Sequence, residues 1–224
     1  MTQNFYRAFE DRHRGSRALI KARLGAYLPF LAPLPRPGLA AQALDLGCGR
    51  GEWLELLSES GFEARGVDLD QGMLAACRER ALAVEHADAL ATLQAAPDAS
   101  LDLVSAFHLV EHIGFDLVQQ IASEALRALR PGGLLIMETP NPENLVVASS
   151  GFHMDPSHLK PIPPLLLDFV VEFAGFVRHK VGRLQDAPHV REDTPLALMT
   201  VLDGVSTDYV VVAQKAAPAE QMAA

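Results

Sequence analysis

The chain has 224 residues, of which 49% are hydrophobic and 21% are charged, and its formal net charge is −9. This composition is typical of a globular domain with a full core, and the negative charge argues against a general nucleic-acid-binding protein. No apolar run approaches the roughly 20 residues that cross a bilayer, so we expect no membrane span. Arg7, Glu10 and Asp11 stand where a secretory signal would be apolar. We therefore expect a cytoplasmic protein.

The N-terminal segment differs from the rest in charge. Residues 1–23 hold six basic and two acidic residues, a balance of +4, which leaves −13 for the remainder. A basic segment on an acidic body indicates contact with an anionic acceptor or a membrane surface, or else a solvated helix face. A helix is predicted over 16–28, ended by Pro29 and a proline-rich linker up to residue 38. Residues 1–38 are thus predicted to be a helical extension and linker.

Strands and helices then alternate along the chain. Strands are predicted at 41–46, 63–68, 83–86, 100–107 and 134–138, and helices at 52–60, 72–81, 89–95 and 115–130. Strands separated by helices indicate an α/β fold with a parallel sheet covered on both faces.

The last third of the chain has a different pattern. Residues 141–164 are rich in proline and poorly periodic, and loops of this length in a compact domain are usually functional. A helix at 165–173 and closing strands at 176–184 and 206–212 are predicted, and residues from 213 onward form an Ala-rich tail. The predicted domain is 39–215, with an acceptor-covering loop at 140–164 and a disordered tail at 216–224.

A glycine-rich loop follows the first predicted strand. Gly47, Gly49 and Gly51 permit a tight turn and close approach of a ligand to the backbone, and the amides that start the next helix attract a negative group. Glu52 occupies the position where the dinucleotide fingerprint needs its third glycine, which argues against NAD or FAD. In S-adenosylmethionine the negative group would be the methionyl carboxylate, with Asp45 pairing to the ammonium.

Two acids follow the next two strands. Asp68 lies about 20 residues beyond the first glycine, where a carboxylate typically holds a ribose diol. Asp88 follows the third strand, at a position suited to the adenine amino group.

These residues together resemble the motif set of class I S-adenosylmethionine-dependent methyltransferases. Residues 45–51 resemble the first motif, Asp68 the second, residues 88–89 the third, and residues 107–108 with 111–112 the fourth. The resemblance implies a Rossmann-like seven-stranded sheet of order 3-2-1-4-5-7-6 with strand 7 antiparallel, and S-adenosyl-L-methionine as cofactor. The implied cofactor-binding residues are Arg17, Asp45, Gly47, Cys48, Gly49, Gly51, Trp53, Asp68, Leu69, Asp88, Ala89, Phe107 and His108.

A narrower resemblance covers residues 5–17, 49–53, 138–144 and 155–158, which look like methyltransferase domains of bacterial O-antigen and capsule biosynthesis. Some of these relatives cap a polysaccharide by methylating a terminal phosphate. The resemblance implies that the acceptor is a glycan or a phosphorylated glycan, either free or attached to a lipid. It also implies polysaccharide-assembly proteins at the inner membrane as partners. The protein would then be peripheral to that membrane.

The acceptor decides which side chains the chemistry needs. A phosphate is already anionic and needs cations, for which Arg7 and Arg14 are candidates. A sugar hydroxyl must lose a proton, so a base is needed, and His112 and His153 are the candidates. The remaining candidate substrate-binding residues are Asp155 and His158, on the long loop.

Alternatives remain open on function and on metals. The acceptor could be a small metabolite or lipid precursor, and a non-catalytic regulatory subunit would keep the same cofactor loop. A metal held by His153, Asp155 and His158 is the less favoured interpretation, and the isolated Cys48 and Cys77 form no zinc motif. We assign no metal site from the sequence.

Overall fold

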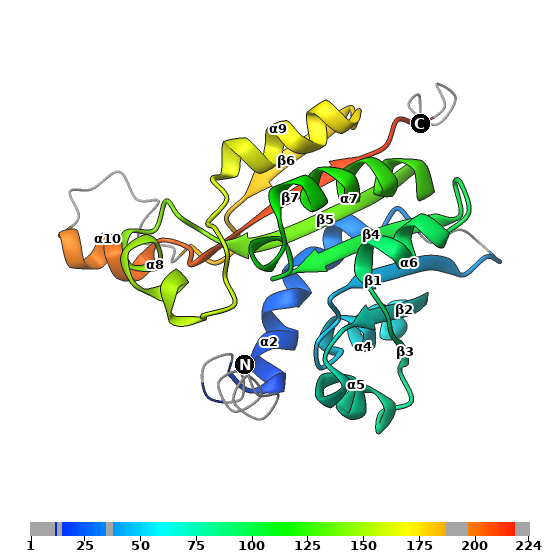
Figure 1. Cartoon of the computed structure of the whole chain (residues 1–224), viewed down its shortest axis with the longest axis horizontal. Helices are drawn as coiled ribbons and strands as arrows, with labels where there is room; N and C mark the ends of the chain where they lie inside the picture. Colours follow the sequence, from blue (N-terminus) through cyan, green and yellow to red (C-terminus); the bar gives the residue numbers. More distant parts are fainter. Residues whose placement is uncertain (1–11, 13–14, 35–37, 187–196, 218–224) are drawn as a thin grey trace.

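The computed structural model describes residues 12, 15–34, 38–186 and 197–217. Its strands are β1 (Ala41–Leu46), β2 (Phe62–Asp68), β3 (Ala83–His86), β4 (Leu101–Phe107), β5 (Leu129–Pro140), β6 (Arg178–Gly182) and β7 (Asp208–Gln214). In these residues they form a seven-stranded sheet of order β3-β2-β1-β4-β5-β7-β6 (Figure 1). β7 runs antiparallel to both β5 and β6, and the other pairs are parallel. The predicted order and the antiparallel seventh strand are confirmed.

The described α-helices are α2 (Arg17–Leu24), α3 (Leu28–Leu31), α4 (Glu52–Glu59), α5 (Gln71–Arg78), α6 (Ala89–Ala95), α7 (Phe115–Ala128), α8 (Leu145–Ser149), α9 (Pro164–Ala174) and α10 (Leu198–Gly204). Short 3-10 turns occupy Gly25–Tyr27, Val110–His112 and Gly151–Met154. None of the helices in the described ranges is long and apolar enough to cross a membrane.

Each face of the sheet has its own core. On one face, Ile121 of α7 and Leu167 of α9 pack with sheet residues such as Leu44. On the other face, Leu31 of α3 and Leu57 of α4 belong to a second cluster. These side chains are at most 2% exposed. Burying a leucine side chain contributes about 1.5–3 kcal/mol, so the two apolar layers hold the strand ends in fixed positions.

The N-terminal helix differs from its prediction. Instead of one helix over 16–28 ended by Pro29, the segment is α2, a 3-10 turn and then α3. Pro29 lies in the first turn of α3, where its missing N–H removes no helical hydrogen bond. Tyr27 and Leu31 are 2% exposed, so burial keeps this segment turning against the sheet. Residues 35–37 of the predicted linker lie outside the described residues.

The later elements also depart from their predicted bounds. α7 ends at Ala128 rather than at residue 130, because Leu129 already pairs with Leu101 as the start of β5. The loop predicted at 141–164 contains α8 and a 3-10 turn, and α10 was not predicted. Ala213 and Gln214, assigned to the tail, are paired strand residues of β7. Of the tail predicted to be disordered at 216–224, residues 218–224 lie outside the described residues.

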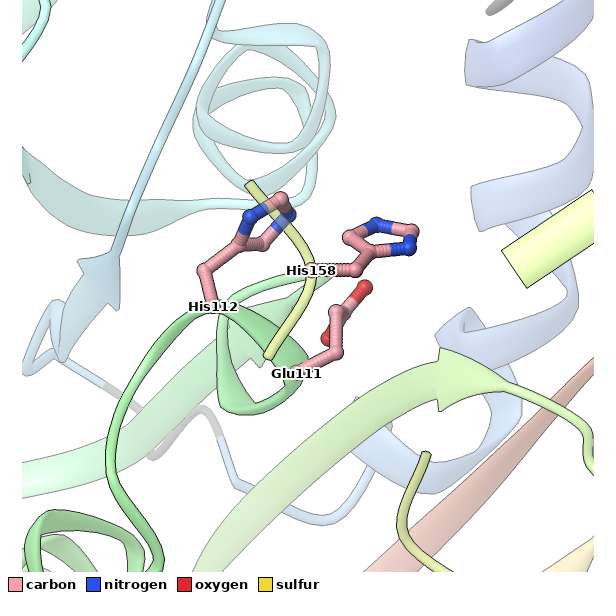
Figure 2. A group of neighbouring side chains, drawn as sticks. All are labelled: Glu111, His112 and His158. Carbon is pink, nitrogen blue, oxygen red and sulfur yellow. The ribbon is translucent and has the colours of Figure 1, made fainter. Parts of the chain in front are cut away.

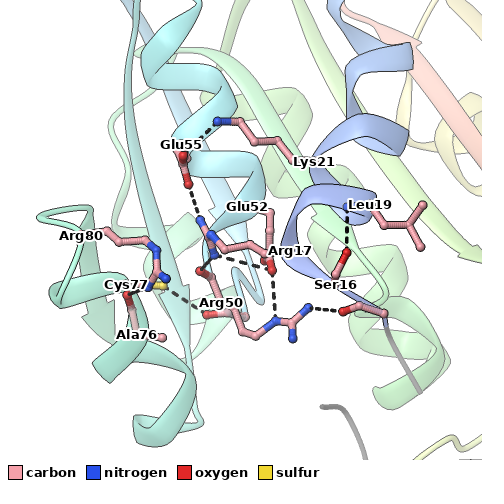
Figure 3. A network of polar contacts seen from close by, with 12 residues as sticks. Ser16, Arg17, Leu19, Lys21, Arg50, Glu52, Glu55, Ala76, Cys77 and Arg80 are labelled. Atoms are coloured by element: carbon pink, nitrogen blue, oxygen red, sulfur yellow. Dashed lines mark hydrogen bonds and ion pairs between the residues drawn. The ribbon is translucent and has the colours of Figure 1, made fainter. Parts of the chain in front are cut away.

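Ion pairs fasten α2 to α4 (Figure 3). The Arg17 guanidinium pairs with Glu55, and its Nη1 donates to the carbonyl of Arg50 at 2.7 Å. Lys21 Nζ lies 2.9 Å from Glu55 and 2.6 Å from Glu59. Hydrogen bonds from Arg17 and Lys21 lower the pKa of Glu55 to about 2. The N-terminal helix is therefore tied electrostatically to the helix that follows the glycine loop.

We predict that Glu55→Gln lowers the free energy of unfolding at pH 7 by about 1 kcal/mol, because both cations lose their shared partner. The folded pKa lies below the ordinary value of 4.5, so the stabilisation is present above pH 4.5 and is lost as the pH falls toward 2. Thermal unfolding of both proteins across this range measures the difference. Glu79→Gln, on the exposed end of α5, is the control. A difference that stays constant with pH would contradict the assignment.

Candidate functional site

The loop after β1 is bent onto the end of β2. The amides of Gly47 and Cys48 both donate to the carbonyl of Val67, each at 2.9 Å. Gly47, Gly49 and Gly51 have φ of +70°, +51° and +76°, a region that a side chain would strain. The three glycines are therefore required by the path of the backbone.

The Asp68 side chain is hydrogen-bonded to this loop. Its Oδ2 accepts the amide of Gly49 at 2.8 Å, and its Oδ1 accepts the amide of Asp70 at 2.7 Å. These two hydrogen bonds help to fix the orientation of the carboxylate. The carboxylate that the sequence predicts to bind ribose is thus also the group that sets the loop.

A cavity of about 180 Å³ opens beside Asp68. Asp88 borders it from the start of α6, where its Oδ1 also caps the helix by accepting the amide of Ala91 at 2.9 Å. The lining includes eight of the predicted cofactor-binding residues, namely Gly47, Gly49, Asp68, Leu69, Asp88, Ala89, Phe107 and His108. Glycines, an acid at each of two strand ends and an apolar wall fit an adenosine moiety.

A second cavity, of about 370 Å³, lies next to the first. Both are lined by Gly47, Phe107, His108 and His112, so the two cavities adjoin one another. Of the other predicted residues, the larger cavity is lined by Asp45, Cys48, Trp53, Asp155 and His158. The predicted cofactor and acceptor residues are therefore gathered at the carboxyl edge of the sheet, where open α/β sheets bind ligands.

Asp45 and Trp53 form one wall of the larger cavity. Asp45 is 2% exposed, and its Oδ1 accepts the Ser105 hydroxyl at 2.7 Å. The Ser105 oxygen in turn accepts the Trp53 indole N–H at 3.0 Å. Phe107 meets the Trp53 ring edge-on at a centroid distance of 5.1 Å. Trp53 is thus a fixed wall, and Asp45 is oriented to meet a cation.

His108 lies among three carboxylates. Its Nδ1 is 3.1 Å from Glu111, and its Nε2 is 3.4 Å from Glu138 and 3.8 Å from Asp208. Burial opposes the charged imidazole, but Asp208, Glu111 and Glu138 together raise the pKa of His108 well above its ordinary value. Tyr27 donates its hydroxyl to Glu138. His108 is therefore an imidazolium, and it also contributes its backbone amide to the carbonyl of Glu138 at 2.9 Å.

His112 and His158 face each other with ring centroids 4.6 Å apart. The Ser157 hydroxyl donates to Asp155 at 2.6 Å, so its oxygen accepts from His112 Nδ1 at 2.9 Å. His158 Nδ1 donates to the carbonyl of Phe152 at 2.6 Å. Burial lowers the pKa of His112, which keeps this ring neutral. Nδ1 is thus the donor nitrogen in both rings, and Nε2 is the nitrogen left for a ligand.

Three predicted residues that the structure describes line neither cavity: Arg17, Gly51 and His153. His153 is exposed and is not among the cavity-lining residues, so we withdraw its catalytic assignment. Arg17 was predicted to bind the cofactor, but its guanidinium is engaged by Glu55 and the Arg50 carbonyl instead. Arg7 and Arg14 lie outside the described residues.

Sequence reasoning also missed residues that line the larger cavity. Glu138 and Asp208 are supplied by neighbouring strands, Glu52 by the start of α4 and Arg23 by α2. Glu138 is the last residue of the predicted strand 134–138, as Asp68 is of the strand 63–68. The reasoning that singled out Asp68 as an acid at a strand end could therefore have found Glu138 too. No local signal marks Asp208, because its neighbourhood depends on β7 pairing beside β5.

Comparison with known proteins identifies the family. The profile described as "Methyltransferase domain" matches residues 44–137. The solved structure of a SAM-dependent methyltransferase from Archaeoglobus fulgidus is 31% identical, with a TM-score of 0.78, and the match covers 94% of this chain and 100% of that one. The chain belongs to the S-adenosylmethionine-dependent methyltransferase family.

Curated relatives match over shorter stretches. A "Probable S-adenosylmethionine-dependent methyltransferase" of Mycolicibacterium smegmatis is 34% identical over 137 residues, which is 59% of this chain and 51% of the relative. A "Ubiquinone biosynthesis O-methyltransferase" of Methylococcus capsulatus is 33% identical over 108 residues, or 45% and 44% of the two chains. The chain thus spans about half the length of the curated relatives it matches.

The residues present fit the cofactor of this family. The backbone at Gly47 is left-handed, and a Cβ there would lie 3.2 Å from the Leu109 side chain. A larger residue would therefore disturb the loop that would hold the cofactor. Asp68 suits the ribose hydroxyls and Asp45 the methionyl ammonium, each with its orientation fixed by hydrogen bonds. The adjoining cavities would place adenosine beside Asp68 and Asp88 and the methionyl end beside Asp45.

We predict that Asp68→Ala weakens binding of S-adenosylhomocysteine by about ten- to a hundredfold, the cost of losing charge-assisted hydrogen bonds. Isothermal titration calorimetry measures this directly. Asp68→Asn, which keeps an acceptor for the Gly49 amide, should lose less. Asp116→Ala, at an exposed position on α7, is the control. Equal affinity in wild type and Asp68→Ala would remove Asp68 from the cofactor site.

Proposed function

We propose that the chain transfers a methyl group from S-adenosylmethionine to a hydroxyl oxygen. The observation that carries this proposal is the pair of imidazoles, His112 and His158, which face each other and line the larger cavity. A hydroxyl acceptor needs such groups, because its oxygen gains nucleophilicity as it loses its proton.

The chemistry explains what the chain must provide. When bound, the cofactor supplies a methyl group on a positively charged sulfur. In the transfer, the acceptor oxygen bonds the methyl carbon, the carbon–sulfur bond breaks with its electron pair going to sulfur, and the hydroxyl proton leaves. An imidazole Nε2 would accept that proton, and the buried rings of Trp53 and Phe107 would form a fixed apolar wall beside the reacting atoms.

The charge of the larger cavity favours a hydroxyl over a phosphate monoester. Acidic side chains face it from several elements, among them Asp45, Glu138 and Asp155. Of the described residues that line it, Arg23 is the only Lys or Arg. A dianionic phosphate would be repelled here, whereas a neutral hydroxyl would find hydrogen-bond acceptors. Of the two acceptors that the sequence suggests, the hydroxyl is therefore the one we propose.

For the acceptor molecule we propose a sugar hydroxyl of a bacterial surface polysaccharide. The support is the likeness of four sequence segments, 5–17, 49–53, 138–144 and 155–158, to methyltransferase domains of that pathway. The corresponding location is the cytoplasm beside the inner membrane, with polysaccharide-assembly proteins as partners. A small metabolite is the competing acceptor, and the ubiquinone-biosynthesis relative supports it by name.

A screen with radiolabelled S-adenosylmethionine tests the proposal. The acceptors are an unphosphorylated glycan, the same glycan with a terminal phosphate, and a small polyhydroxy metabolite. We expect label on a hydroxyl of the unphosphorylated glycan, as a base-stable ether. Label only on the phosphate, as an ester, would contradict the hydroxyl proposal. Label only on the metabolite would contradict the polysaccharide acceptor. Cofactor binding with no transfer to any acceptor would favour a regulatory subunit.

We further predict that His112→Gln lowers kcat by about a hundredfold or more, the usual effect of losing an acid–base group. Gln cannot act as a base or a comparable ligand, so turnover should fall. The affinity for S-adenosylhomocysteine should stay near the wild-type value. The matched control is His179→Gln. The His179 ring does not line the cavity, and its Nδ1 lies 2.7 Å from Asp168. Parallel losses of affinity and turnover in His112→Gln would indicate a structural role only.

A further inference from the structure

Three side chains on the acceptor side converge in a way that the sequence did not predict. Glu111 and His112 follow β4, and His158 comes from the loop after α8 (Figure 2). Each offers one donor atom, and these atoms lie within 4.8 Å of one another. Atoms bound to one transition-metal ion at about 2.0–2.2 Å lie up to about 4 Å apart, so small side-chain rotations bring the three onto a common centre.

The neighbours of both imidazoles select the form that binds metal. The carbonyl of Phe152 holds the proton of His158 on Nδ1, and the Asp155–Ser157 pair does the same for His112. Metal-ligating histidines in proteins usually donate their second ring N–H in this manner. Among the described residues, Nε2 of His112 has no hydrogen-bond partner, and Nε2 of His158 lies 3.9 Å from its nearest carboxylate oxygen, on Asp155.

Glu111 supplies the negative charge. It is fully buried, and its two oxygens contact His108 Nδ1 at 3.1 Å and the Thr139 hydroxyl at 2.9 Å. Each oxygen has a second lone pair, so both contacts orient the carboxylate without preventing ligation. Glu138 and Asp208 lie on the other side of the His108 ring, within 3.8 Å of its Nε2.

We propose that Glu111, His112 and His158 bind one divalent transition-metal ion, with its open coordination positions toward the acceptor cavity. Two imidazoles and a carboxylate are a ligand set for ions such as Zn²⁺, Mn²⁺ or Co²⁺, whereas Mg²⁺ and Ca²⁺ prefer oxygen ligands throughout. The site rests on the proposed function only in its role, which is to hold the acceptor hydroxyl. In the metal-bound form the two Nε2 atoms are ligands, so the hydroxyl proton would pass to the cavity-lining Asp155 instead of to the imidazoles.

Metal titration of the full chain tests the site without any methyl acceptor. Zn²⁺ is titrated calorimetrically, and Co²⁺ by its visible absorption, with S-adenosylhomocysteine present and absent. We expect one ion per chain. His112→Gln and His158→Gln should each weaken binding by more than about a hundredfold, and Ser157→Ala by about tenfold, because it frees the His112 ring. His179→Gln, outside the cluster, should bind as wild type does.

Affinity for S-adenosylhomocysteine and thermal unfolding confirm that each variant is folded. The proposal is overturned if the wild-type chain binds neither Zn²⁺ nor Co²⁺, or if His112→Gln and His158→Gln bind as tightly as wild type. Both outcomes leave the hydroxyl-transfer proposal standing, because the radiolabel screen tests that separately. Conversely, a metal-binding chain that methylates no acceptor would keep the site and remove the proposed function.

Discussion

The hydrogen bonds that tie the glycine loop to β2 are the constraint on which the site depends. Val67 accepts the amides of Gly47 and Cys48, and Asp68 accepts the amide of Gly49. These contacts exist only because β1 and β2 are parallel neighbours, so both strands end at the same edge. They place the loop backbone, the Asp68 carboxylate and the start of α4 around the two adjoining cavities. A ligand bound there would therefore meet backbone groups whose positions are fixed by the sheet.

His108 connects several elements around the two cavities. This imidazolium links Glu111, Glu138 and Asp208, which come from the turn after β4, from β5 and from β7. Because it lines both cavities, it separates the cofactor side from the acceptor side. His108 is thus a shared partner of three carboxylates that come from three different elements. On its acceptor side lie the rings of His112 and His158, and burial lowers the pKa of His112 where the three carboxylates raise that of His108.

The sequence predicted those parts of the site whose geometry is local. The glycine loop, Asp68 and Asp88 could be found because each lies at the end of a strand, and the strands were recognisable from their apolar runs. The predictions failed where partners are distant in sequence. Arg17 was assigned to the cofactor, but its position is decided by α2 packing on α4, where Glu55 takes it up. Asp208 had no local signal, since it meets His108 only through the pairing of β7 with β5. On the long loop, a 3-10 turn leaves His153 exposed, while His158 lines the cavity.

The central claim is that this backbone cradle, with Asp68, holds S-adenosylmethionine or its demethylated product. The most direct measurement is a calorimetric titration of the folded wild-type chain with S-adenosylhomocysteine. The account predicts a single saturable site with a dissociation constant in the micromolar range, about −8 kcal/mol of binding free energy. Absence of any binding heat with either form of the cofactor, at several temperatures and on demonstrably folded protein, would contradict it.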